Sequence, residues 1–267
     1  MLGFRPRGAF HLLYQPVTAM TKKSGFFFYF SVAMLIVVLV GFSRTLYLRS
    51  IFENPPIPRY LYVHGIALTA WFVFGVVQPF LIRANRVASH RKNGWIGALI
   101  GAVVVATTAF VPFASTARYV PTGTNLDADV STLELGISGM PIVQLVSQVV
   151  WGNLILLLLF SVLLCAAIAF RNRAEVHKRL MLLASLSLVG PALGRIARWP
   201  ALGGEGGPFV PLVFLSLILC IIGHDLYSRR RVHAVTIFGI AALVLAQIAG
   251  VAVAQSDIGQ AFIRAIV

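Results

Sequence analysis

Long apolar runs alternate with short clusters of charged residues along the chain. A membrane-spanning helix needs about 20 apolar residues, and most of the windows that lack a charged residue are near that length. The pattern therefore predicts seven helices. The seven windows are Ser24–Ser43, Tyr60–Ile82, Asn93–Ala117, Leu135–Phe170, Leu180–Gly194, Gly206–His224 and Val232–Ser256.

Two of these windows do not have the length of one straight span. The fourth is too long, so we expect its helix at about residues 146–170, after a lead-in segment Gly139-Met140-Pro141. The fifth is too short, so its helix must continue to about Trp199 to cross, which carries Arg195 to the membrane edge. Gly190-Pro191 should kink that helix.

Composition settles the class of protein. Hydrophobic residues make up 58% of the chain and charged residues only 11%, against about 25% charged in an ordinary soluble domain. This excludes a soluble domain, and it also excludes disorder. The charged residues that give the net charge of +14 lie between the apolar runs. This distribution indicates membrane topology rather than a nucleic-acid partner. We predict an all-α polytopic membrane helix bundle in a lipid bilayer.

The distribution of positive charge predicts the orientation. With the N-terminus in the cytoplasm, fifteen of the 22 lysines and arginines lie on the cytoplasmic side, so the positive-inside rule favours N-in, C-out. Residues 1–25 are then a cytoplasmic extension, 26–256 one transmembrane domain, and 257–267 an external tail. Met20-Thr-Lys-Lys resembles a translation start, which leaves open whether residues 1–19 belong to the native protein.

A short motif recurs at the predicted cytoplasmic turns. Asn85-Arg86-x-x-x-His90-Arg91-Lys92 is repeated as Asn172-Arg173-x-x-x-His177-Lys178-Arg179, and Arg229–His233 is a degenerate third copy. The pattern predicts one leading helix plus three hairpins, each with a histidine where its second helix begins. A genuine duplication and a chance similarity between basic loops are both open.

Four histidines from four helices should gather at the cytoplasmic face. Imidazole is a good ligand for iron, copper and zinc, and two axial histidines on facing helices suit a haem. We take His90 and His177 as candidate metal ligands and His224 as the alternate; His233 is the fourth. The alternative is that these histidines lie at headgroup level in basic loops.

Two further features could support a cofactor, one at that face and one, Arg195, at the outer end of the helix stripe that begins with His177. Gly94 and Gly97 share a helix face with His90, and this flat wall suits a planar cofactor; close helix packing is the alternative. Arg195 shares a face with His177, so it could hold a propionate, a quinone oxygen or another anion. Snorkelling towards the headgroups is the alternative for Arg195.

A separate polar group is expected at the external side. His64, Gln148 and Arg195 could line an open cavity for a quinone, a substrate or a second cofactor. The alternative is a set of interhelical hydrogen bonds. We expect Asp225 to pair with Arg229 at i+4. Carboxylates within the spans are nearly absent, which argues against a proton-driven transporter.

Four runs of sequence carry a family resemblance. They are Gly41–Leu48 (GFSRTLYL), Val63–Gly65 (VHG), His90–Gly97 (HRKNGWIG) and His177–Ala184 (HKRLMLLA). Together they resemble a widespread family of uncharacterised bacterial inner-membrane proteins, over about Phe26 to Leu202. The resemblance implies a multi-pass protein of the bacterial inner membrane. A histidine followed by a basic residue and glycine at a helix start is also distantly similar to small b-type cytochromes.

Three functions follow from these observations, and the sequence leaves open whether any is enzymatic. The first is a non-catalytic accessory or assembly subunit of a larger membrane complex, respiratory or redox in kind, with partner proteins in the membrane. The second is a redox protein that binds haem b or a transition metal near the cytoplasmic face, with quinone as electron partner. The third is a transporter of small molecules or lipids.

Overall fold

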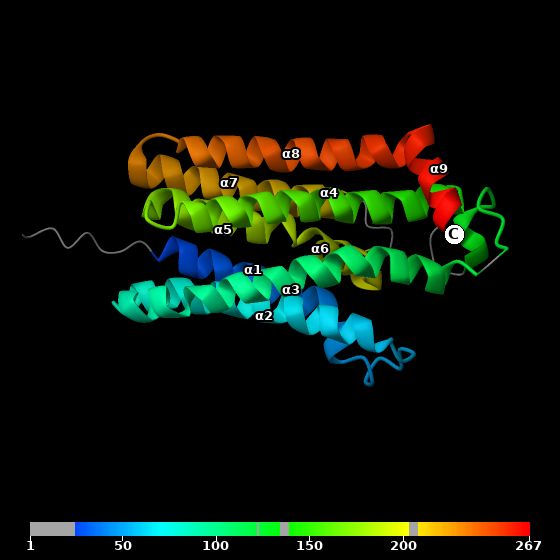
Figure 1. The fold of residues 1–267 in the computed structure, drawn as a ribbon, viewed down its shortest axis with the longest axis horizontal. Helices are drawn as coiled ribbons and strands as arrows, with labels where there is room; N and C mark the ends of the chain where they lie inside the picture. Colours follow the sequence, from blue (N-terminus) through cyan, green and yellow to red (C-terminus); the bar gives the residue numbers. More distant parts are fainter. Residues whose placement is uncertain (1–24, 122, 134–138, 203–207) are drawn as a thin grey trace, which may run out of the picture.

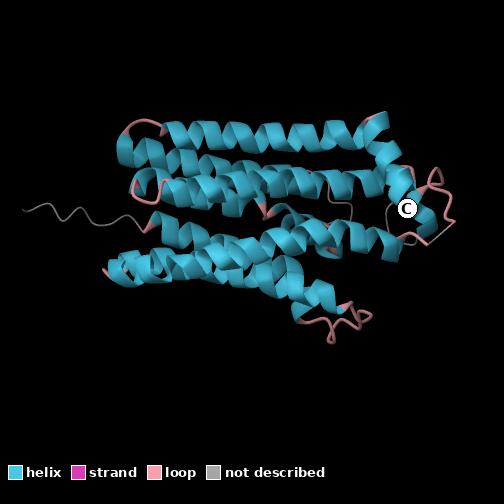
Figure 2. Ribbon diagram, in the orientation of Figure 1, coloured by secondary structure: helices cyan, strands magenta, loops and turns pink. Residues whose placement is uncertain are grey.

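The computed structural model describes residues 25–121, 123–133, 139–202 and 208–267. Within these residues the chain is built from helices (Figures 1 and 2). In chain order they are α1 (Phe26–Phe42), the π-helical η1 (Ser43–Tyr47), α2 (Arg59–Arg83), α3 (Val87–Tyr119), the 3-10 turn η2 (Val130–Leu133), α4 (Ile142–Ala169), α5 (Ala174–Ser187), α6 (Gly190–Ala197), the 3-10 turn η3 (Pro200–Leu202), α7 (Phe209–Arg229), α8 (Ala234–Gln255) and α9 (Asp257–Ile266).

The helices confirm the predicted polytopic membrane bundle. In the described part of the chain, six of them are long and apolar enough to cross a membrane: α1 with η1, α2, α3, α4, α7 and α8. The pair α5 and α6, bent by 40° at its break, supplies a seventh crossing if it is counted as one span. Side chains on the outside of such a bundle face lipid, which explains the many exposed leucines, valines and phenylalanines.

The connections between helices lie at the two ends of the bundle, as the hairpin pattern predicts. Figure 1 places the start of α1 and the α2–α3, α4–α5 and α7–α8 connections at one end. We call this the basic end, because its helix ends and turns carry Arg83, Arg86, Arg91, Lys92, Arg171, Arg173, Lys178, Arg179, Arg229, Arg230 and Arg231. The other, far end carries α9 and the α1–α2 and α3–α4 connections. That the basic end is cytoplasmic stays a prediction.

Helix α4 begins earlier than the sequence predicted. It starts at Ile142, directly after Pro141, rather than at about residue 146. The first amides of a helix have no partner within it, and here the preceding loop supplies two: Ile142 N donates to Ala128 O at 3.0 Å and Val143 N to Leu126 O at 2.9 Å. The loop thus stabilises an extra turn that hydrophobicity alone does not indicate.

The core lies where α4 meets its neighbours. Helix α4 packs against α3, α5 and α8, while α2 packs between α1 and α3. Trp71 of α2 meets Phe160 of α4 edge to face, with ring centres 5.0 Å apart. Its Nε1 donates to Ser185 Oγ of α5 at 3.2 Å. This buried indole therefore joins three helices through packing and one hydrogen bond.

The predicted kink at Gly190-Pro191 is present. Helix α5 ends at Ser187 and α6 begins at Gly190, with Pro191 in its first turn, where its missing N–H costs least. Helix α6 ends at Ala197, two residues before the predicted limit at Trp199. Helix α6 packs against α1, and this packing positions Arg195 of α6 near the end of α1.

The segment expected as an external tail includes a docked helix. Ser256 caps α9, since its Oγ accepts from Gly259 N at 3.1 Å. Trp151 Nε1 of α4 donates to Gly259 O at 3.2 Å, and Ile263 is fully buried against the start of α4. Residues 257–266 are therefore part of the packed fold at the far end.

An ion pair also ties α9 to the α3–α4 connection, and it should respond to acid. Arg264 Nη1 donates to Asp127 Oδ2 at 3.1 Å, and this hydrogen bond holds the pKa of the Asp127 carboxyl below its ordinary value. The contact therefore stabilises α9 fully above that ordinary pKa, and the stabilisation is lost as pH falls through the lowered one. We expect Asp127→Asn to speed amide exchange of α9 modestly at pH 7.

The measurement is hydrogen exchange of the detergent-solubilised protein, corrected for intrinsic rates. Wild-type α9 should match the Asp127→Asn variant only in acid. Glu53→Gln removes another exposed far-end carboxylate and should leave α9 unchanged. Equal protection of α9 in Asp127→Asn and wild type at pH 7 would show that the ion pair does not hold this helix.

Candidate functional site

The repeated motif builds two equivalent helix starts at the basic end. Arg86 and Arg173 are the N-cap residues of α3 and α5, and each histidine is the fourth residue of its helix. His90 N donates to Arg86 O at 3.0 Å and His177 N to Arg173 O at 2.9 Å. The third, degenerate copy differs, because His233 is itself the N-cap of α8.

His90 and His177 lie together, as the sequence predicted for the candidate ligands. Their ring centres are 6.3 Å apart and the rings meet edge to face. Both side chains are half-buried. The pair sits between the first turns of α3 and α5, at the boundary of the membrane-spanning region.

A hydrogen bond sets the tautomer of the His177 ring. His177 Nδ1 lies 2.8 Å from Ala167 O; a carbonyl only accepts, so Nδ1 carries the proton and Nε2 keeps its lone pair when the ring is neutral. The His90 ring interacts with the backbone of Gln78. Its Nδ1 is fully buried and has no hydrogen-bond partner among the described residues. Each neutral ring can thus offer one nitrogen to a third group.

The side chain of Gln78 is the other unsatisfied group near this pair. Both its Nε2 and its Oε1 are buried without a partner in the part of the chain that the structure describes. Buried polar atoms are nearly always hydrogen-bonded, and exceptions often mark a bound water, ion or ligand. Gln78 and His90 Nδ1 can therefore each bind a further polar group at the basic end.

The glycines that follow His90 face neighbouring side chains. A Cβ added at Gly97 would lie 2.6 Å from the ring of Phe74, and one at Gly101 2.5 Å from Leu164 Cδ2. Only Gly94 of this face is open, with nothing within 4 Å of an added Cβ. The deeper part of the face is thus filled by helix packing, the alternative that the sequence left open.

His224 does not join the pair. Its ring stacks on Phe26 with centres 4.0 Å apart and parallel planes, and it meets Phe27 edge to face at 5.5 Å. Both phenylalanines belong to the first turn of α1. His224 therefore helps to fasten α1 to α7.

The residues proposed for an external cavity lie apart from this cluster. His64 Nδ1 is 3.4 Å from Thr107 Oγ1, a contact between α2 and α3. The Arg195 guanidinium lies over the Phe42 ring at 4.3 Å, and its Nη1 donates to Pro191 O at 3.1 Å. Gln148 is half-buried on α4. The His64–Thr107 and Arg195–Phe42 contacts fit interhelical packing, and an external cavity stays a prediction.

A buried ion pair next to the histidines is the feature that the sequence analysis missed. Arg179 of α5 pairs with Asp225 of α7, and the side chains are only 2% and 1% exposed. Asp225 Oδ2 also accepts from Thr236 Oγ1 at 2.6 Å and from His233 N at 3.0 Å. One carboxylate thus connects α5, α7 and the start of α8.

The expected pairing of Asp225 with Arg229 is wrong. Arg229 instead donates to Glu175 Oε2 at 2.9 Å, and Glu175 also binds Lys178 and Arg179, each at 2.6 Å. Asp225 faces the bundle interior, where α5 packs. It therefore pairs with Arg179 across the interface rather than with Arg229 on its own helix. The sequence did contain a signal for this pair: Asp225 is a lone carboxylate at the end of an apolar run, and such a group needs a buried partner of opposite charge.

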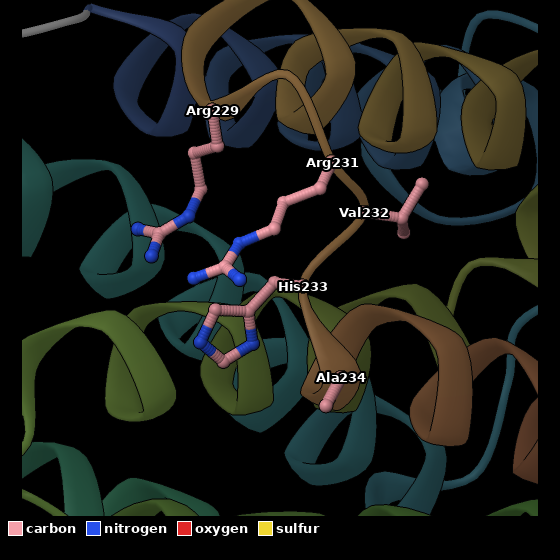
Figure 3. A pocket seen from close by; sticks show the side chains of 5 residues that line it. All are labelled: Arg229, Arg231, Val232, His233 and Ala234. Atoms are coloured by element: carbon pink, nitrogen blue, oxygen red, sulfur yellow. The ribbon is translucent and has the colours of Figure 1, made fainter.

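Two hollows lie at this end of the bundle. One, of about 200 Å³, is lined by Glu175, Lys178, Arg179, His224, Ser228 and Arg229. The other, of about 340 Å³, is lined by Arg229, Arg231, Val232, His233 and Ala234, at the connection between α7 and α8 (Figure 3). Both have arginine side chains in their walls.

Comparison with known proteins adds no family to these observations. No family model, no curated protein and no solved structure matches the chain. The family resemblance described above therefore stays a prediction, and function must be argued from the residues themselves.

Proposed function

We propose that this integral membrane protein binds a transition-metal ion through His90 and His177 at the basic end of its bundle. The observation that supports this most is the pair of facing imidazoles, each with one nitrogen that can be offered to a third group. Metal-binding histidines usually donate their other ring N–H to a backbone carbonyl or a carboxylate, and His177 does so to Ala167.

The distance between the rings suits a single ion. Imidazole nitrogen binds first-row metals at about 2.0–2.1 Å, so two rings on opposite sides of one ion have centres about 6 Å apart. The observed 6.3 Å is close to this value. Small rotations of two half-buried side chains would direct both lone pairs to one point.

Haem fits this site less well than an ion does. A haem needs a planar gap beside its ligands, and the face of α3 that runs inward from His90 is filled by Phe74 and Leu164 at Gly97 and Gly101. An ion needs no such gap. We therefore do not propose haem as the group that His90 and His177 hold.

The charges around the pair bear on the choice of ion. Arg91 acts electrostatically on His90, while the charge of Lys178, which follows His177 in α5, is offset by Glu175 at 2.6 Å. A positive surrounding disfavours a dication and favours an ion of low charge. Among the metals that imidazole binds well, copper meets this condition in its monovalent state. When bound, copper would supply one-electron transfer, and His90 and His177 would hold it at the membrane boundary.

Copper binding by purified protein tests the proposal. Copper(I) is titrated into the detergent-solubilised protein against a chromophoric chelator. We expect one ion per chain, and His90→Ala or His177→Ala should weaken binding more than about 100-fold, because even outer partners of a metal ligand cost 10–100-fold. His64→Ala and His224→Ala remove imidazoles from elsewhere and should bind as wild type does.

Two results would contradict the proposal. One is copper binding that is unchanged in the His90→Ala, His177→Ala double variant. The other is a wild-type protein that takes up neither copper nor zinc while its thermal midpoint shows that it is folded. A loss shared equally by His224→Ala would move the site to the alternate ligand predicted from the sequence.

The accessory-subunit and transporter functions remain predictions, as do partner proteins, quinone and the bacterial inner membrane. Broken helices often form the binding sites of transporters, so the bent pair α5–α6 is the feature that favours transport. However, Leu186, Val189 and Ala192 are fully buried around the break. That packing is better explained by a structural bend than by a substrate cavity.

A further inference from the structure

The α7–α8 connection forms a positively charged hollow that the metal proposal does not use. Figure 3 shows the side chains of Arg229, Arg231 and His233 directed to one side of the connection, while Val232 points away. These residues, with Ala234, line the hollow of about 340 Å³. Its walls thus offer two guanidinium groups and an imidazole.

Local backbone geometry produces this arrangement. Arg230 has φ +59°, in the left-handed region, and its N–H donates to Leu226 O at 3.0 Å as α7 ends. A non-glycine residue rarely adopts this conformation. Here it reverses the chain sharply, so that the arginines on either side of Arg230 both line the hollow.

The imidazole in the hollow is a hydrogen-bond donor. His233 Nδ1 accepts from Val235 N at 3.1 Å, as the N-cap of α8. A ring that accepts at Nδ1 must carry its proton on Nε2. Burial lowers the pKa of His233, which keeps the ring in this neutral form at pH 7. Nε2–H is then available as a donor.

Positive charge is in excess around the hollow. Asp225 is bound to Arg179, and Glu175 is shared by Lys178, Arg179 and Arg229. Arg231 is exposed and has no ion-pair partner among the described residues. The paired Arg229 is held in place by Glu175 at 2.9 Å. An anion would therefore meet one fixed and one adaptable guanidinium.

We propose that this hollow binds a phosphate group, and that its source is the headgroup of an anionic membrane lipid. Guanidinium groups bind phosphate oxygens in a bidentate fashion, and His233 Nε2–H adds a third contact. The hollow lies between the end of one membrane-spanning helix and the start of the next, which is the depth of lipid phosphates. Basic pockets between helices at this depth suit anionic headgroups.

Lipid binding to the delipidated full chain tests the proposal. Short-chain phosphatidylglycerol, short-chain phosphatidylcholine and inorganic phosphate are each titrated and followed by native mass spectrometry. Phosphatidylglycerol should bind more tightly than either of the others. Arg231→Gln should weaken it about tenfold or more, because it removes a guanidinium that binds the phosphate directly through charge-assisted hydrogen bonds.

Two variants sharpen the experiment. His233→Asn removes the Nε2–H donor but keeps a good N-cap for α8, so it should weaken phosphatidylglycerol binding while the thermal midpoint stays within a few degrees. Arg230→Gln removes an equal charge from the adjacent residue, which does not line the hollow. It should change the affinity less than twofold.

Each outcome has a definite meaning. Preferential phosphatidylglycerol binding that falls in Arg231→Gln and His233→Asn but not in Arg230→Gln supports the proposal. Inorganic phosphate binding as tightly as the lipid, with the same dependence on Arg231, overturns the lipid as the source. Equal losses in Arg230→Gln and Arg231→Gln, or no loss in either, overturn the site. Copper binding is measured separately, so neither proposal depends on the other.

Discussion

Replacement of Asp225 by asparagine should destabilise the folded bundle by about 3–5 kcal/mol, the usual cost of removing one partner from a buried ion pair. The asparagine keeps the shape of the side chain but leaves the Arg179 guanidinium, 2% exposed, without its buried counter-charge. Asparagine has a single acceptor oxygen, so its NH₂ group must face either the Arg179 guanidinium or the Thr236 Oγ1 and His233 N donors. The contacts among α5, α7 and α8 should loosen together.

Thermal unfolding in detergent measures this effect. Asp257→Asn changes an exposed carboxylate at the start of α9 and should melt within a degree or two of wild type. A double variant, Arg179→Met with Asp225→Leu, should recover part of the loss, because apolar residues of similar volume often replace a buried pair at little cost. The recovery stays partial because Thr236 Oγ1 and His233 N still lose their acceptor. An Asp225→Asn protein that melts with wild type would mean that the pair does not stabilise the bundle.

Adding one methyl group at Gly41 should also destabilise the protein, by about 1–3 kcal/mol, as overpacking of a close contact does. A Cβ there would lie 2.5 Å from Ala192 O and 2.8 Å from Ala192 Cα. Both atoms belong to the backbone of α6, so no side-chain rotation can relieve the clash. Helices α1 and α6 would have to separate.

The matched control is Gly75→Ala in α2. Nothing lies within 4 Å of a Cβ added at Gly75, and alanine is the better helix former by about 0.8–1.0 kcal/mol. The two alanine variants should therefore shift the thermal midpoint in opposite directions, Gly41→Ala downwards and Gly75→Ala slightly upwards. Equal shifts would mean that α1 and α6 are not in close contact at Gly41.

Features encoded along a single helix could be predicted from the sequence. Apolar windows predicted the six long membrane-capable helices in the described part of the chain, and the seventh crossing where α5 and α6 count as one bent span. Gly190-Pro191 predicted the break between α5 and α6, because proline lacks the N–H that a helix interior needs. The repeated motif gave the matched positions of His90 and His177. These predictions succeeded because each depends on local chemistry and on the length needed to cross a bilayer.

Features that depend on how helices pack against each other could not be predicted in the same way. Asp225 pairs with Arg179 rather than with Arg229 because of how α7 is rotated against α5. The spacing of residues within one helix does not specify that rotation. The face of Gly97 is filled by Phe74 of α2 for the same reason. The early start of α4 depends on a loop that folds back to meet its first amides.

The metal content of the protein purified gently from its native membrane, without added metal, tests the central claim most directly. It is measured together with the absorption spectrum and compared with the His90→Ala, His177→Ala double variant prepared in the same way. We expect close to one copper or other first-row metal ion per chain in the wild type, and no Soret band. The double variant should be free of metal. A folded wild-type protein without metal, or equal metal content in both, would contradict the assignment of His90 and His177 as ligands.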